Sequence, residues 1–126
     1  MIFGKKYKVL IAEDDEDMLL LYDKILRDPK YKLFKVRNGI ECIEQVSKIA
    51  PDVIIMDIMM PEMDGIATVL KLRSEETTRS IPIIMVTQVK EEEDEIVSRN
   101  LGVVDYCRKT PQMEDFLIKI ERILKR

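Results

Sequence analysis

Short apolar runs alternate along this chain with longer segments in which apolar residues recur every three or four positions. The runs predict strands, and the longer segments predict amphipathic helices. The central run, residues 53–56, lacks the polar alternation of a strand with one wet face and so predicts a strand that is buried on both faces. The predicted strands span residues 7–12, 32–36, 53–56, 83–87 and 103–107. The predicted helices span residues 18–25, 40–49, 66–73, 91–101 and 113–124.

This regular alternation of strands and helices is typical of the α/β class. Parallel strands joined by right-handed helical crossovers form a doubly wound sheet with helices on both faces. We therefore expect a five-stranded parallel sheet in the flavodoxin-like order 2-1-3-4-5. With 126 residues and no linker, repeat or low-complexity tract, the chain is expected to form one domain over residues 1–126.

The central apolar run ends at a single carboxylate. Val53–Met56 contains no polar residue, Asp57 follows it directly, and Pro61 and Gly65 come soon after. Proline cannot continue a strand ladder and glycine permits a sharp turn, so we expect a loop over residues 58–65. Asp57 should then lie at the carboxyl end of the central strand, which is where sites form in open α/β sheets.

Polar side chains end the other strands of the predicted sheet as well. Glu13 and Asp14 follow the first strand, Thr87 ends the fourth, and Lys109 follows the fifth. Because the carboxyl ends of parallel strands meet at one edge, these groups and Asp57 should share one cleft. Three carboxylates packed together repel one another unless a hard cation lies among them. Mg²⁺ suits this place best, because it takes one or two carboxylates and keeps several waters.

This set of groups suits phosphoryl transfer to a carboxylate. A carboxylate nucleophile forms an acyl phosphate, and the transfer needs in-line positioning and neutralised charge on the equatorial oxygens. Asp57 would attack the phosphorus. Mg²⁺ held by Glu13 and Asp14 would take one phosphoryl oxygen. The Lys109 ammonium would take a second oxygen, and the Thr87 hydroxyl a third.

Composition narrows the chemistry that is open to the chain. The sequence has no histidine, which removes the usual general base and the usual zinc ligand. Its two cysteines, Cys42 and Cys107, lack metal-ligand or redox spacing and are expected to be small buried hydrophobes. A net charge of −3 without a basic stripe argues against direct binding of nucleic acid. With no bilayer-length apolar run and no signal segment, we expect a cytoplasmic protein without membrane insertion.

The ordered set of motifs resembles the receiver domain of two-component response regulators, and in length the chain resembles single-domain chemotaxis-type regulators. The resemblance covers essentially the whole chain. Its motifs are the acidic pair after the first strand, the segment D-x-x-M-P-x-M-D-G from Asp57 to Gly65, Thr87, and the stretch from Gly102 through Asp105-Tyr106 to Lys109.

The resemblance implies specific roles for the matched residues. Asp57 would be the phosphoacceptor, and Mg²⁺ would be held by Glu13, Asp14, Asp57 and the backbone carbonyl of Met59. Thr87 and Tyr106 would form the switch pair that carries the signal away from the site.

By the same resemblance, the chain would be a phosphorylation-dependent signalling switch. A histidine kinase or phosphotransfer protein would supply the phosphoryl group. A downstream protein would bind the face formed by the fourth helix, the fifth strand and the fifth helix. No turnover of an external substrate is expected, so the protein would not be an enzyme in the ordinary sense.

Three positions depart from the usual pattern of the family. Proline usually follows the lysine directly, in a cis bond, whereas here the order is Lys109-Thr110-Pro111. The residue after the switch threonine is usually small and here is Gln88. The first acidic residue is Glu13, where the family often has Asp.

Other interpretations use some of the same residues. Asp14-Asp15 before a helix, taken alone, favours an N-cap over a metal site. A phosphatase of the haloacid-dehalogenase type needs a second Asp two residues after the nucleophile, where this chain has Met59. A flavodoxin-type nucleotide site needs a phosphate-binding loop, and the 4 glycines lack that spacing. The remaining alternative is a receiver-like interaction module that works without phosphorylation, whose sign would be a missing acidic or lysine residue.

Overall fold

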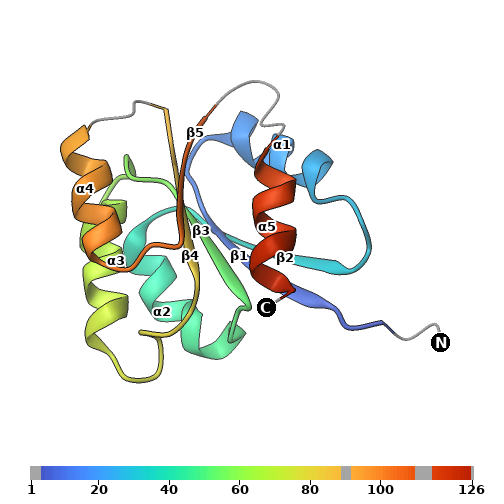
Figure 1. Cartoon of the computed structure of the whole chain (residues 1–126), viewed down its shortest axis with the longest axis horizontal. Coiled ribbons are helices and arrows are strands. Elements are labelled where there is room, and N and C mark those ends of the chain that lie inside the picture. Colours follow the sequence, from blue (N-terminus) through green and yellow to red (C-terminus); the bar gives the residue numbers. More distant parts are fainter. Residues whose placement is uncertain (1–3, 89–91, 110–114, 126) are drawn as a thin grey trace.

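The fold is a parallel sheet covered by helices on both faces (Figure 1). The computed structural model describes residues 4–88, 92–109 and 115–125. The strands are β1 (Tyr7–Ala12), β2 (Tyr31–Val36), β3 (Val53–Met56), β4 (Ile83–Thr87) and β5 (Asp105–Arg108). They pair in parallel in the order β2-β1-β3-β4-β5, which confirms the predicted fold class and strand order.

The helices form two layers, one on each face of the sheet. They are α1 (Glu16–Ile25), α2 (Gly39–Ile49), α3 (Gly65–Ser74), α4 (Glu92–Asn100) and α5 (Phe116–Leu124). Figure 1 shows α1 and α5 on one face and α2, α3 and α4 on the other. The chain therefore winds in both directions from β1, as in a doubly wound sheet.

Alternate residues of each strand supply two separate cores. In β1, Val9 and Ile11 face α1 and α5, whereas Leu10 faces α2 and α3. On the first of these faces, the rings of Tyr22 and Phe116 pack with centroids 5.5 Å apart. Because both faces of the sheet are covered, the inner strands β1, β3 and β4 are apolar at nearly every position, which explains the uninterrupted runs in the sequence.

Side chains cap the amino ends of α1, α2 and α3. Asp15, Asn38 and Asp64 each have extended backbone angles, and each accepts a hydrogen bond from an N–H two or three residues further on. Such caps satisfy donors that a helix leaves unpaired at its start. Asp15 therefore fills the N-cap of α1, and Asp14 precedes it.

Several predicted boundaries differ from the structure by one or two residues, and two of these differences have a clear structural reason. Gly65 is not part of the loop but the first residue of α3. β5 begins at Asp105 and not at Val103, because the chain is still tied to the end of α4: Gly102 has φ +76°, and the N–H of Val103 donates to the carbonyl of Ser98 at 3.2 Å. This is the hydrogen-bond pattern of a Schellman motif. The predicted helix starts at Glu91 and Met113 lie outside the described residues.

Arg73 joins three parts of the backbone near the end of α4. Its guanidinium donates to the carbonyl of Leu101 at 2.9 Å and to that of Gly102 at 3.3 Å. It also donates to the carbonyls of Arg79 and Ile81, at 2.9 and 3.0 Å, in the segment that leads from α3 to β4. One half-buried side chain of α3 thus holds the carboxyl end of α4.

Both cysteines are free and buried, as predicted. Burial raises the pKa of the Cys42 thiol to about 12. Among the residues that the structure describes, we find no helix with the length and apolar character needed to cross a membrane.

Candidate functional site

The backbone of the sheet brings four of the predicted residues to one edge. The N–H of Asp57 donates to the carbonyl of Ala12 at 3.1 Å, so Asp57 lies beside the end of β1, where Glu13 begins. On the other side of β4, the N–H of Lys109 donates to the carbonyl of Thr87 at 2.7 Å. The strand ends of β1, β3, β4 and β5 are therefore aligned, as the strand order requires.

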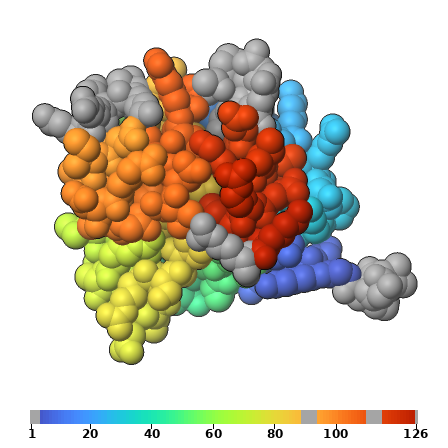
Figure 2. All heavy atoms as spheres, in the orientation of Figure 1, coloured from blue at the N-terminus to red at the C-terminus, as the bar shows by residue number. Residues whose placement is uncertain are grey.

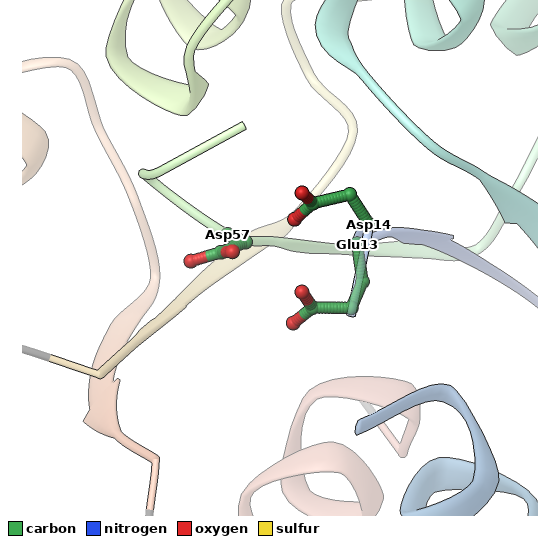
Figure 3. A group of neighbouring side chains, drawn as sticks. All are labelled: Glu13, Asp14 and Asp57. Atoms are coloured by element: carbon green, nitrogen blue, oxygen red, sulfur yellow. The ribbon is translucent and has the colours of Figure 1, made fainter. Parts of the chain in front are cut away.

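Three carboxylates converge at this edge. One oxygen each of Glu13, Asp14 and Asp57 can be chosen so that all lie within 4.8 Å of one another. Figure 3 shows Glu13 and Asp14 extending from the end of β1 toward the side on which Asp57 lies. Glu13 is 1% exposed and Asp57 is 4% exposed, whereas Asp14 is open to solvent. The cluster is thus reachable from the Asp14 side.

Lys109 bridges the two buried carboxylates. Its Nζ lies 2.7 Å from Glu13 Oε1 and 3.1 Å from Asp57 Oδ2. Glu13 Oε2 accepts a hydrogen bond from the Asp15 N–H at 3.1 Å, and Asp57 Oδ1 accepts a long one from the Met59 N–H at 3.4 Å. Both carboxylates are therefore held in place by one ammonium and by one backbone donor each.

The electrostatics of the site favour an added cation. Burial raises the pKa of Glu13 to about 7; the hydrogen bond from Lys109 opposes this rise, and the charge of Asp57 adds to it. Burial also raises the pKa of Asp57, against the attraction of Lys109. Burial lowers the pKa of Lys109, but the two carboxylates together raise it by more, so the net shift is upward. A single ammonium leaves these carboxylates short of positive charge.

The donor set fits a hard divalent cation. Carboxylate oxygens are the ligands that Mg²⁺ prefers, and Mg²⁺ normally keeps waters in its remaining positions, for which the exposed side at Asp14 leaves access. Glu13, Asp14 and Asp57 were the carboxylates predicted for this site, and the structure brings them together. The Met59 carbonyl as a further ligand stays a prediction.

The predicted switch residues both point to the side of the sheet that carries α4. Tyr106 pairs with Met85 in the sheet and belongs to the core on the side of α2 and α3. Thr87 is two residues after Met85 and so lies on the same face, because side chains alternate along a strand. Both are almost fully buried, at 1% exposure for Thr87 and 4% for Tyr106. Their coupling stays a prediction.

One contact at the site was not predicted from the sequence, and one of the three departures from the family pattern lies outside the described residues. Lys109 was predicted to bind a phosphoryl oxygen, but its contact with Glu13 was not foreseen, because β3 and β4 lie between β1 and β5 in the sheet. Gln88 lies exposed after β4. The shifted proline follows Lys109 within residues 110–114, outside the described part of the chain.

Comparisons with known proteins agree with this architecture. The family model of the response regulator receiver domain matches residues 9–121. The alkaline phosphatase synthesis transcriptional regulatory protein PhoP of Bacillus subtilis (strain 168) is 29% identical over 119 residues, which make up 94% of this chain and 49% of PhoP. The chain thus spans about half the length of the curated relatives it matches.

Solved structures give the same result. The signal receiver domain of a signal transduction histidine kinase from Syntrophus aciditrophicus is 32% identical with a TM-score of 0.84, over 94% of this chain and 90% of that one. The chemotaxis protein CheY4 of Vibrio cholerae is 27% identical with a TM-score of 0.85, over 94% of this chain and 99% of that one. Because the family model matches nearly the whole length of this chain, the chain belongs to the response regulator receiver domain family.

Proposed function

We propose that this receiver domain, over residues 1–126, is a signalling switch that accepts a phosphoryl group on Asp57. The observation that carries the proposal is the position of Asp57, a buried carboxylate that Lys109 contacts at 3.1 Å within an acidic cluster. A histidine kinase or phosphotransfer protein is the expected donor. The protein is expected to work in the cytoplasm and to turn over no external substrate.

The transfer follows from the groups at the site. An oxygen of Asp57 attacks the phosphorus of the donor and forms the P–O bond of an acyl phosphate. The bond from phosphorus to the donor atom breaks, and its electron pair leaves with the donor. Lys109 is close enough to Asp57 to neutralise an equatorial oxygen, and the Thr87 hydroxyl is the candidate for another. Mg²⁺ held by Glu13, Asp14 and Asp57 would supply further charge neutralisation.

The output of the switch is proposed to leave through α4, β5 and α5. Figure 2 shows both α4 and α5 on the visible face of the molecule, and Figure 1 shows β5 between them. The two helices expose apolar side chains, among them Ile96 and Val97 of α4 and Ile118 of α5. A downstream protein that prefers one arrangement of these elements would bind in proportion to phosphorylation. We do not expect this domain itself to bind nucleic acid.

Intact-mass measurement with acetyl phosphate tests the proposal. Wild type should gain one phosphoryl group with Mg²⁺ present and none in chelator, and Asp57→Asn should gain none. Asp52→Asn is the matched control, because it makes the same charge change at the opposite end of β3 and should be phosphorylated like wild type. A phosphorylated species that survives Asp57→Asn would exclude Asp57. An unphosphorylated wild type would favour the interaction module that works without phosphorylation.

A further inference from the structure

The segment between β3 and α3, residues 57–64, is held from two sides by glycines. We call this segment the acceptor loop. On one side, Gly65 lies against the end of β3: its N–H donates to the carbonyl of Ile58 at 2.8 Å, and a Cβ at this position would lie 2.1 Å from the carbonyl oxygen of Asp57. This glycine belongs to the motif that ends the loop.

On the other side, the loop contacts Gly39, which is remote in sequence and has no place in the site described above. The Gly39 N–H donates to the Met63 carbonyl at 3.1 Å. A Cβ on Gly39 would lie 1.9 Å from Thr68 Oγ1 and 2.8 Å from the Met63 carbonyl oxygen. Real Cβ atoms do not approach other atoms this closely, so any side chain at this position must displace its neighbours.

The glycine is required for space and not for backbone conformation. Among the described glycines, only Gly102 has a positive φ, so alanine could adopt the backbone angles of Gly39.

The contact is also rigid on the α2 side. Asn38 Oδ1 accepts from the Glu41 N–H at 2.9 Å, while Glu41 Oε1 accepts from the Arg37 N–H at 2.9 Å. This reciprocal cap fixes the start of α2.

Thr68 is equally constrained on the α3 side. It is fully buried, and its hydroxyl donates to the carbonyl of Asp64 at 2.7 Å. Rotation of this hydroxyl away from a new methyl group would break that bond and leave a buried polar group unpaired. The part with the most freedom to respond is the acceptor loop, between the Met63 carbonyl and Asp57.

We propose that Gly39 is a positioning residue for phosphorylation at Asp57. The first residue of α2 sets the place of the Met63 carbonyl, and through Asp64 and Gly65 it sets the place of the Asp57 backbone. This inference rests on the proposed function. It adds a residue, contributed by a different βα unit, that determines where the phosphoacceptor lies without touching the phosphoryl group.

The test is the rate of phosphorylation of Gly39→Ala by acetyl phosphate with Mg²⁺. Relief of the close contacts needs a shift of about 1 Å, and misplacement of that size lowers rates by about 10- to 100-fold. Amide resonances of the acceptor loop should also shift in the unphosphorylated protein. Gly4→Ala, where a Cβ would meet nothing within 4 Å, should keep the wild-type rate and resonances.

Two further variants separate positioning from stability. Ile120→Val removes a methyl group from the core on the α1 and α5 side and should destabilise the fold without slowing phosphorylation of the folded fraction. Adding Thr68→Ala to Gly39→Ala removes the atom 1.9 Å from the new methyl and should return part of the lost rate. If Gly39→Ala alone does not fold, the double variant should be phosphorylated more slowly than Thr68→Ala.

Each failure has its own sign. A Gly39→Ala protein with the wild-type rate and wild-type loop resonances would overturn the inference. A loss of rate in Gly39→Ala that its unfolded fraction fully explains would also overturn the inference. A double variant that is phosphorylated as fast as Thr68→Ala would do the same. An unphosphorylated wild type would overturn the proposed function instead, and the loop resonances of Gly39→Ala would still decide whether α2 positions the loop.

Discussion

Lys109 contacts two buried carboxylates at once, and this contact sets the charge balance of the site when Asp57 carries no phosphoryl group. Its ammonium is shared between Glu13 and Asp57, which burial alone would drive toward their neutral forms. The side chain of Glu13 is thus engaged by Lys109. A phosphoryl group on Asp57 would offer Lys109 new oxygens and so compete with this contact.

Asp14 is the carboxylate of the cluster that can be removed with the least effect on the fold, because it is exposed and does not contact Lys109 in the structure. We expect Asp14→Asn to raise the Mg²⁺ dissociation constant by at least about tenfold, since a charged ligand is lost. The free energy of unfolding should change by less than about 0.5 kcal/mol, or rise slightly as repulsion is relieved. Titration with Mg²⁺ followed by heteronuclear spectra, and urea unfolding, measure the two effects.

Asp17→Asn provides the control for this change. It removes the same charge from an exposed position in the first turn of α1, outside the carboxylate cluster. Its Mg²⁺ affinity should stay within about twofold of wild type, as expected for a screened charge at the surface. Equal loss of affinity in both variants would mean that the cluster acts only through its general field, and unchanged affinity in Asp14→Asn would remove Asp14 from the site.

At the level of elements, β4 and β5 connect the site to the proposed output face. Thr87 and Tyr106 lie on the same face of these neighbouring strands, and both are buried. Phosphorylation adds about −1.5 to −2 charges at Asp57, which should draw the Thr87 hydroxyl toward it. Movement of Thr87 would change the packing around Tyr106, and through it the packing of β5 against α4.

The element-level prediction is that Thr87→Ala can still be phosphorylated but loses the response of Tyr106. Ring resonances of Tyr106 should shift on phosphorylation in wild type and in Thr87→Ser, which keeps the hydroxyl, but not in Thr87→Ala. Thr78→Ala is the control. Thr78 follows α3 and is a buried threonine, and its hydroxyl donates to the carbonyl of Leu72 within α3. An equal shift of Tyr106 in wild type and Thr87→Ala would show that the signal takes another route.

The elements themselves were largely predictable, because period and apolar content directly reflect burial on both faces of the sheet. The start of β5 was not, since Val103 and Val104 have strand-like side chains while the backbone of Val103 is still bonded to α4. Convergence of Glu13, Asp14 and Asp57 followed from topology. The contact of Lys109 with Glu13 depends on side-chain length and rotamer, and the role of Gly39 depends on atoms of α3, so neither could be inferred from sequence spacing.

At the scale of the whole molecule, Arg73 is the side chain that joins α3 to the end of α4 and to the start of β4. We expect Arg73→Lys to lower the free energy of unfolding by about 1–3 kcal/mol, because an ammonium cannot reproduce the fan of donors that a guanidinium offers to four carbonyls. Urea denaturation measures this loss. Hydrogen exchange should rise at the amides of Leu101 to Val103.

Arg99→Lys is the comparison for that experiment. Arg99 is an exposed residue of α4 paired with Glu95 at 3.1 Å, and its replacement should change stability by less than about 0.5 kcal/mol. If the two variants lose equal stability, Arg73 acts only as a surface charge and its four hydrogen bonds contribute nothing particular.

The hydrogen bonds of Arg73 anchor α4 at its carboxyl end. The helix has 9 residues and is about 13 Å long, so a tilt of about 10° around the anchored carboxyl end moves the amino end by about 2 Å. In the sequence, the amino end of α4 at Glu92 is the end that follows Thr87 and β4. A signal from Asp57 that reaches this amino end would therefore displace α4 where it is farthest from its anchor. The anchored carboxyl end would keep the rest of α3 and the sheet in place.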